Sequence, residues 1–162
     1  MRTSRIAIIP GVPRDLTYIA ANMSDADWHE VSCQLAPGVT RLEVAWVALQ
    51  YGAWVATIDG QPVACFGFAQ RSATTLEAFA WGTDRMSRAV PAITRFIRRD
   101  LAPGWFAQGV RRLEARSLDT HEAAHRWMTA TGAVREAVLP DCGRDGEDFI
   151  LFAWRRRDIE EA

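Results

Sequence analysis

Hydrophobic positions in the first third of the chain predict one strand followed by three helices. The short apolar run from Ile6 to Ile9 is typical of a buried strand, and Pro10-Gly11 ends it. Apolar residues then recur every three or four positions in three segments, and Thr40 with Glu43 forms a capping box at the start of the third. The predicted helices run from Pro13 to Met23, from Ser24 to Leu35 and from Thr40 to Leu49.

The middle of the chain predicts a β-hairpin. Two segments rich in β-branched and aromatic residues, Trp54–Ile58 and Pro62–Ala69, flank an Asp59-Gly60 pair that suits the positive φ angles of a tight turn. The remaining pattern predicts strands over Leu76–Trp81, Arg112–Leu118, Ala133–Val138 and Phe149–Arg155, helices over Pro91–Leu101 and His121–Thr131, and a polar loop over Gly82–Ala89. This order indicates one mixed α/β domain over residues 1–162, with a central sheet flanked by helices.

Composition narrows the classes of function. The chain has 162 residues, 49% hydrophobic and 24% charged, and its net charge of -1 gives no electrostatic basis for binding nucleic acid. All 19 basic residues are arginines, which excludes a Walker phosphate loop and lysine-imine chemistry. The three cysteines are far apart, which argues against a disulfide scaffold. The N-terminal apolar run is too short for a signal peptide or a membrane span, so neither is expected.

Residues His121-Glu122-Ala123-Ala124-His125 match the HExxH pattern of zinc hydrolases. On a helix, this spacing places two imidazoles and a carboxylate close together. A catalytic zinc ion needs a third protein ligand, and Met128 stands where the longer motif has glycine. His121 also falls at the predicted start of the helix rather than in its interior. The pattern is therefore disfavoured as a metal site, and no metal is expected.

The order of elements resembles the GNAT fold of Gcn5-related N-acetyltransferases. Three local segments are more specifically similar to the GNAT-like internal virion protein A family of T7-type phages: residues 54–67 (WVATIDGQPVACFG), 81–84 (WGTD) and 126–133 (RWMTATGA). The resemblance implies a mostly antiparallel sheet of about seven strands. It also implies that the fourth and fifth strands splay apart, here just past Trp81, and that acyl-CoA lies in the gap.

The resemblance also implies where a cofactor would bind. Acetyl-CoA would contact the end of the fourth strand and the turn after it, at Phe79, Ala80, Trp81, Gly82, Thr83, Arg88, Ala89 and Val90. GNAT enzymes have a glycine-rich Q/RxxGxG/A turn here because its main-chain N–H groups hold the pyrophosphate. This chain has a single glycine in the stretch, and Met128 replaces the tyrosine that protonates the departing thiolate in many GNAT enzymes.

Candidate chemistry on the acceptor side involves carboxylates. Glu77 on the fourth strand is the candidate general base, with a water relay as the alternative, and an acidic loop containing Asp141, Asp145 and Glu147 would border a cationic amine.

Three functions remain open. The departures from the glycine turn and the tyrosine favour a phage virion assembly or interaction module with a degenerate acyl-CoA cleft. Its expected partners are other virion proteins, in the host cytoplasm or the virion. An active acyl-CoA-dependent N-acetyltransferase acting on an amine is the first alternative. A zinc hydrolase is the second.

Overall fold

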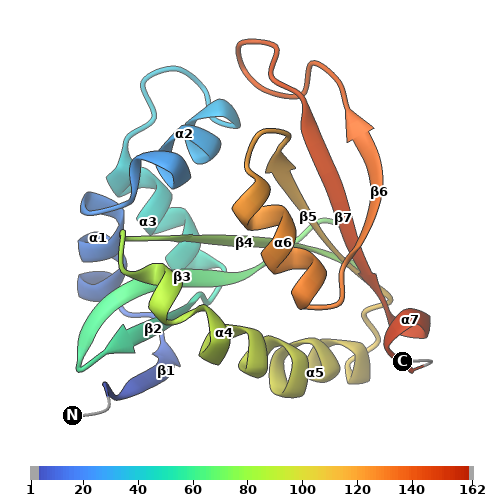
Figure 1. The fold of residues 1–162 in the computed structure, drawn as a ribbon, viewed down its shortest axis with the longest axis horizontal. Coiled ribbons are helices and arrows are strands. Elements are labelled where there is room, and N and C mark those ends of the chain that lie inside the picture. The colour runs from blue at the N-terminus through green and yellow to red at the C-terminus, as the bar shows by residue number, and fades with distance from the viewer. Residues whose placement is uncertain (1–3, 161–162) are drawn as a thin grey trace.

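Seven strands form one mixed sheet in the computed structural model, which describes residues 4–160 (Figure 1). The strands lie in the order β1-β2-β3-β4-β5-β7-β6, and all neighbours are antiparallel except β4 and β5. They are β1 (Ile6–Pro10), β2 (Trp54–Ile58), β3 (Gln61–Gln70), β4 (Thr75–Gly82), β5 (Arg112–Leu118), β6 (Val134–Leu139) and β7 (Phe149–Arg155). The predicted mixed α/β class and mostly antiparallel sheet are confirmed.

Along the chain, helices follow β1, separate β4 from β5 and β5 from β6, and follow β7. They are α1 (Pro13–Ala21), α2 (Asp25–Cys33), α3 (Arg41–Gln50), α4 (Val90–Phe96), α5 (Ala102–Ala107), α6 (Glu122–Ala130) and α7 (Arg156–Glu160). The part of the chain that the structure describes contains no helix long and apolar enough to cross a membrane.

Two predictions for the segment after β4 are wrong in detail. The expected loop over Gly82–Ala89 contains a 3₁₀ turn at Met86–Arg88, and Gly82 belongs to β4. The expected helix over Pro91–Leu101 instead passes through a π-helical turn, Ile97–Leu101, into α5. Pro103 at the start of α5 has no N–H to donate to the preceding turn, which accounts for the widened ladder there.

The predicted capping box at the start of α3 and the predicted tight turn between β2 and β3 are both present. Thr40 Oγ1 accepts from the Glu43 N–H at 3.3 Å, and the Glu43 carboxylate accepts from the Thr40 N–H at 2.6 Å, which completes the capping box. The β2–β3 turn has positive φ at Asp59 (52°) and Gly60 (82°).

Helices cover both faces of the sheet. On one face, α1 and α3 pack against β2 and β3 through a core that includes Leu16, Ala45, Val55 and Cys65. On the other face, α4 packs on Ala64 and Phe66 of β3, and α5 and α6 pack on β5 and β7. Figure 1 shows α4 and α5 along the bottom of the view, with α2 and α3 on the other side of the sheet.

Candidate functional site

Strands β4 and β5 pair over three residues each, in a ladder that ends at Glu77 and Glu114. Beyond these residues β4 stays paired with β3 as far as Gly82, and β5 stays paired with β7 along its whole length. Each strand therefore follows the twist of its own antiparallel partner, and the two diverge. The predicted splay between the fourth and fifth strands is confirmed, but it begins after Glu77, four residues before the predicted position at Trp81.

The main chain of Ala80 faces this wedge. The Gly82 N–H donates to Asp27 Oδ2 at 2.7 Å and its carbonyl accepts from the Ser24 N–H at 2.8 Å, so both groups of Gly82 point away from β3. The Thr83 N–H instead donates to the Val63 carbonyl of β3. Because main-chain direction alternates along a strand, the N–H and carbonyl of Ala80 point to the same side as those of Gly82.

A cavity of about 560 Å³ fills the wedge and reaches both faces of the sheet. Apolar side chains of α2, α3 and the loop between them line it on one face, and helical residues after β4 and β5 line it on the other. The first group is Val31, Leu35, Val39, Val44, Val47 and Tyr51, and the second is Ile97, Ala102, Ala124, Trp127 and Met128. Two ligands that approach from opposite faces can therefore meet between β4 and β5.

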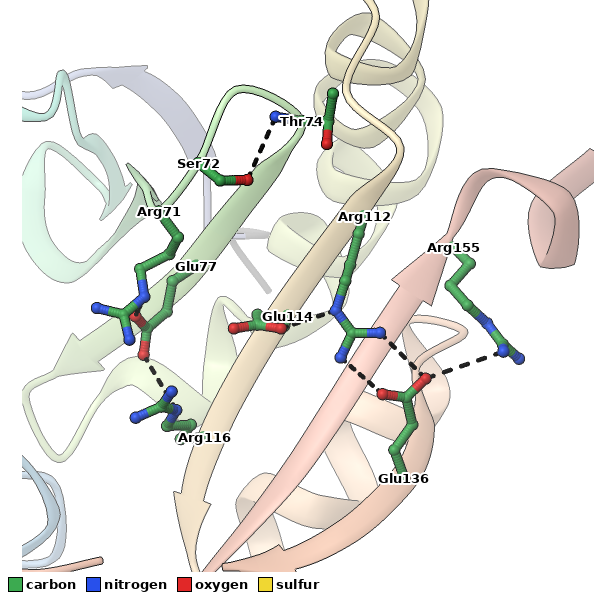
Figure 2. Close-up of polar contacts among 9 residues, drawn as sticks. All are labelled: Arg71, Ser72, Thr74, Glu77, Arg112, Glu114, Arg116, Glu136 and Arg155. Carbon is green, nitrogen blue, oxygen red and sulfur yellow. Dashed lines mark hydrogen bonds and ion pairs between the residues drawn. The ribbon is translucent and has the colours of Figure 1, made fainter.

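Glu77 lies at the start of the wedge, with its carboxylate between two arginines (Figure 2). Glu77 Oε2 is 2.9 Å from Arg71 Nε, and Oε1 is 3.8 Å from Arg116 Nε. Arg116 Nε is buried and has no hydrogen-bond acceptor among residues 4–160. The side chain thus lines the cavity as an ion-paired carboxylate, and its role as general base stays a prediction.

Further ion pairs tie β5 to the strands on its other side. Arg112 contacts Glu114 at 2.7 Å and binds both carboxylate oxygens of Glu136 on β6, at 2.6 and 3.2 Å (Figure 2). Hydrogen bonding to Arg112 lowers the pKa of Glu136. This network links β5 to β6 at the end of β5 that is still paired with β4.

A second carboxylate, Glu30 of α2, also lines the cavity. Its Oε2 lies 2.5 Å from His121 Nδ1 and accepts a hydrogen bond from Ser117 Oγ at 3.1 Å. The hydrogen bond to Glu30 raises the pKa of His121. Sequence reasoning missed this residue because α2 was interpreted through its apolar face. The polar positions Asp27 and Glu30, one helical turn apart, were the available signal.

The HExxH residues do not converge on one point. His121 is the N-cap of α6 and contacts Glu30, whereas His125 Nε2 lies 2.9 Å from the Leu118 carbonyl. The Glu122 side chain is 81% exposed and pairs with Arg126. Within residues 4–160, no group of three His, Cys, Asp or Glu side chains is placed to hold a metal ion.

The predicted acidic loop packs on α2 rather than on the cavity. Cys33 Sγ, at the end of α2, donates to Glu147 Oε1 at 3.3 Å, and Glu147 Oε2 accepts from the Asp145 N–H. The Asp141 N–H donates to Asp148 within the loop. None of Asp141, Asp145 and Glu147 is among the described residues that line the cavity, so their substrate-side role stays a prediction.

Comparisons with known proteins identify the fold. No protein-family model and no curated protein sequence matches the chain. An N-acetyltransferase from Staphylococcus aureus Mu50 has a similar structure, with a TM-score of 0.73 and 18% identity over 94% of this chain and 99% of that one. A GNAT-family acetyltransferase from Bacillus anthracis has a TM-score of 0.71 and 15% identity over 96% and 98%. This is the GNAT fold.

A third structure with the GNAT fold was solved with a bound ligand. The Salmonella typhimurium protein yncA, with its cofactor acetyl-CoA, has a TM-score of 0.69 and 15% identity over 93% of both chains.

Among the residues assigned by the GNAT resemblance, Met128 lies at the cavity wall, where its thioether has no proton to give a departing thiolate.

The predicted cofactor-binding positions divide into two groups, those that line the cavity and those that do not. Three of the predicted cofactor positions, Phe79, Ala80 and Trp81, line the cavity. The other five, Gly82, Thr83, Arg88, Ala89 and Val90, are not among the described residues that line it. Their role stays a prediction, and most of their N–H groups already have acceptors within the chain.

Proposed function

We propose that this chain is an acyltransferase that moves an acyl group from a thioester donor, with acetyl-CoA as the test donor, to an amine. The separation of β4 from β5 after Glu77 carries the proposal. It leaves wedge-facing main-chain groups at Ala80, beside a cavity that reaches both faces of the sheet. The donor occupies the side of α4 to α6, and the amine occupies the side of α2 and α3.

The acceptor is a primary amine with an apolar body. Val31, Val44, Val47 and Tyr51 give the α2–α3 side of the cavity its apolar wall. Glu30 supplies a carboxylate at the same cavity, and burial of a cationic amine requires such a partner. Small apolar amines therefore suit this site, with the ammonium beside Glu30 and the apolar body against the wall of α2 and α3.

The transfer step follows from this arrangement. A carboxylate, Glu30 or Glu77, takes a proton from the bound ammonium, and the amine lone pair attacks the thioester carbonyl carbon. The C–N bond forms, the C–S bond breaks and the electron pair leaves on sulfur. As the amide forms, its nitrogen loses a second proton, which water relays to the thiolate because Met128 has no proton to give. Positioning of the two reactants supplies much of the acceleration.

Binding and transfer assays test the proposal. Acetyl-CoA is expected to raise the unfolding temperature, because a ligand at ten times its Kd stabilises the native state by about 1.4 kcal/mol. Thiol release with tryptamine as acceptor is expected to exceed hydrolysis. Ala80→Trp, which fills the wedge, abolishes both effects, whereas Ala73→Trp, at an exposed position in the β3–β4 turn, leaves them unchanged. No stabilisation of the wild type at millimolar acetyl-CoA would contradict the proposal.

A specific observation favours a second candidate, a virion assembly or interaction module. Five N–H groups of the turn after β4, from Gly82 to Ala89, already have acceptors, and Met128 stands where many GNAT enzymes have the tyrosine. Both features remove groups that catalysis uses and leave the packing intact. The phage part of this candidate rests on the sequence resemblance of residues 54–67, 81–84 and 126–133. It is favoured if no thioester binds to the folded protein.

A further inference from the structure

We propose that the wedge recognises the acyl-pantetheine arm of its thioester donor and leaves the nucleotide of CoA unrecognised. This inference rests on the proposed acyltransferase function and names its donor class. The donor is a thioester on a pantetheine-like arm, whatever group the arm is attached to at its far end.

Five main-chain N–H groups in the turn after β4 already donate to acceptors within the protein, so they are not available to a pyrophosphate. The N–H of Gly82 donates to Asp27 Oδ2 at 2.7 Å, and that of Thr83 donates to the Val63 carbonyl at 2.9 Å. The N–H groups of Met86, Arg88 and Ala89 donate to carbonyls of the same turn at 2.8 to 3.2 Å. A phosphate could reach these donors only by exchanging one hydrogen bond for another, which yields little net free energy.

Space is also short at this end of the wedge. A Cβ at Gly82 would lie 2.6 Å from the Val63 carbonyl oxygen and 2.7 Å from Met86 Cβ, so the turn folds tightly back on β3. The cavity lining on β4 extends to Trp81 and includes no residue of the described turn 82–90. The bound part of a donor is therefore the part that lies between β4 and β5.

Charge at the turn further disfavours a pyrophosphate. The Asp27 carboxylate occupies the Gly82 N–H, and Asp84 is exposed in the turn itself. Both repel an anion. Two exposed arginines, Arg85 and Arg88, are the cations that could oppose this effect. Arg88 Nη2 donates to Ser4 Oγ at 3.0 Å, which directs its guanidinium toward the N-terminal segment.

Calorimetric titration of the full chain with three ligands tests the inference. Acetyl-CoA carries both the acyl-pantetheine arm and the nucleotide. S-acetylpantetheine carries the arm alone, and adenosine 3′-phosphate 5′-diphosphate carries the nucleotide alone. The two thioesters are expected to bind with Kd values within about threefold of each other, and the nucleotide is expected not to bind at about 1 mM. An acetyl-CoA preference of about thirtyfold or more, or competition by the nucleotide, overturns the inference and leaves the proposed acyltransferase standing.

A double arginine variant tests whether side chains of the turn bind the nucleotide of CoA. The double variant Arg85→Ala, Arg88→Ala is expected to change the Kd of acetyl-CoA by less than about twofold, with folding checked by its unfolding temperature. A weakening of about tenfold that spares S-acetylpantetheine shows nucleotide recognition through side chains and overturns the inference. If neither thioester binds the wild type, the proposed function itself fails, which is a different result from a nucleotide preference.

Discussion

The Asp27 carboxylate of α2 accepts a hydrogen bond from the Gly82 N–H at the end of β4, over 2.7 Å. The Ser24 N–H, one residue before α2, donates to the carbonyl of the same glycine at 2.8 Å. Burial raises the pKa of Asp27, against the opposing effect of the Gly82 hydrogen bond. This double contact fixes the first turn of α2 against the end of β4 that has separated from β5, and one helical turn later it brings Glu30 to the cavity.

Removal of this contact is expected to destabilise the fold. Asp27→Ala leaves the Gly82 N–H without its carboxylate and should lower the free energy of unfolding by about 1–3 kcal/mol. Asp27→Asn keeps an oxygen acceptor and should cost less than half of that. Urea denaturation of the three proteins measures both differences. Equal stability of Asp27→Ala and the wild type would show that the contact does not hold α2 in place.

Glu30 is expected to act on the amine and not on the thioester. Glu30→Gln should lower the rate of transfer to an apolar amine about tenfold or more, because it removes the partly buried negative charge that attracts the ammonium. The Kd of acetyl-CoA should not change.

Glu43→Gln is the matched control for this experiment. Glu43 also lines the cavity, but it caps α3 through Thr40, a role that glutamine can fill. An equal loss of activity in both variants would contradict a specific role for Glu30.

The His121–Glu30 pair predicts a pH dependence of stability. The pKa of His121 is raised in the folded state, so protonated His121 contributes stability that is complete below its unfolded pKa of about 6.5. That contribution is lost as the pH rises through the folded-state pKa. The difference in unfolding free energy between the wild type and His121→Gln should therefore be larger at pH 6 than at pH 9. A difference that is constant or grows with pH would contradict the pairing.

The three cysteines are expected to react in a fixed order. Cys33 is 4% exposed, and burial together with the Glu147 hydrogen bond raises the pKa of its thiol to about 11. Cys65 is fully buried, and burial raises its pKa as well. Cys142 is exposed in the β6–β7 loop. Iodoacetamide at neutral pH should therefore modify Cys142 first, with the site identified by mass spectrometry of peptides. Early labelling of Cys33 would contradict the packing of α2 on this loop.

Sequence patterns predicted elements whose causes are local. The Asp59-Gly60 turn and the capping box of Thr40 and Glu43 depend on residues within a few positions of each other. The chain order of strands and helices, together with the resemblance, led to the correct fold and to a splay between the fourth and fifth strands. These signals need no knowledge of distant partners.

The site was harder to predict because it depends on distant partners. The wedge begins where the pairing of β4 with β5 ends, at Glu77 and Glu114, and no local pattern of β4 contains that position. Glu30 meets Ser117 and His121 across about ninety positions of sequence. The sequence gives no partner for the acidic residues of the β6–β7 loop, but Glu147 accepts a hydrogen bond from Cys33 of α2. The sequence shows which side chains are charged. Contacts between distant elements determine which of those side chains line the cavity.

The amide resonance of Ala80 tests most directly whether a thioester donor binds in the β4–β5 wedge. Titration of the ¹⁵N-labelled protein with acetyl-CoA is expected to shift the Ala80 N–H, which faces the wedge. The Thr83 N–H, bonded to Val63 on the other side of β4, should respond much less. An Ala80 resonance that stays unmoved at millimolar acetyl-CoA, or shifts confined to the turn 82–90, would contradict the account.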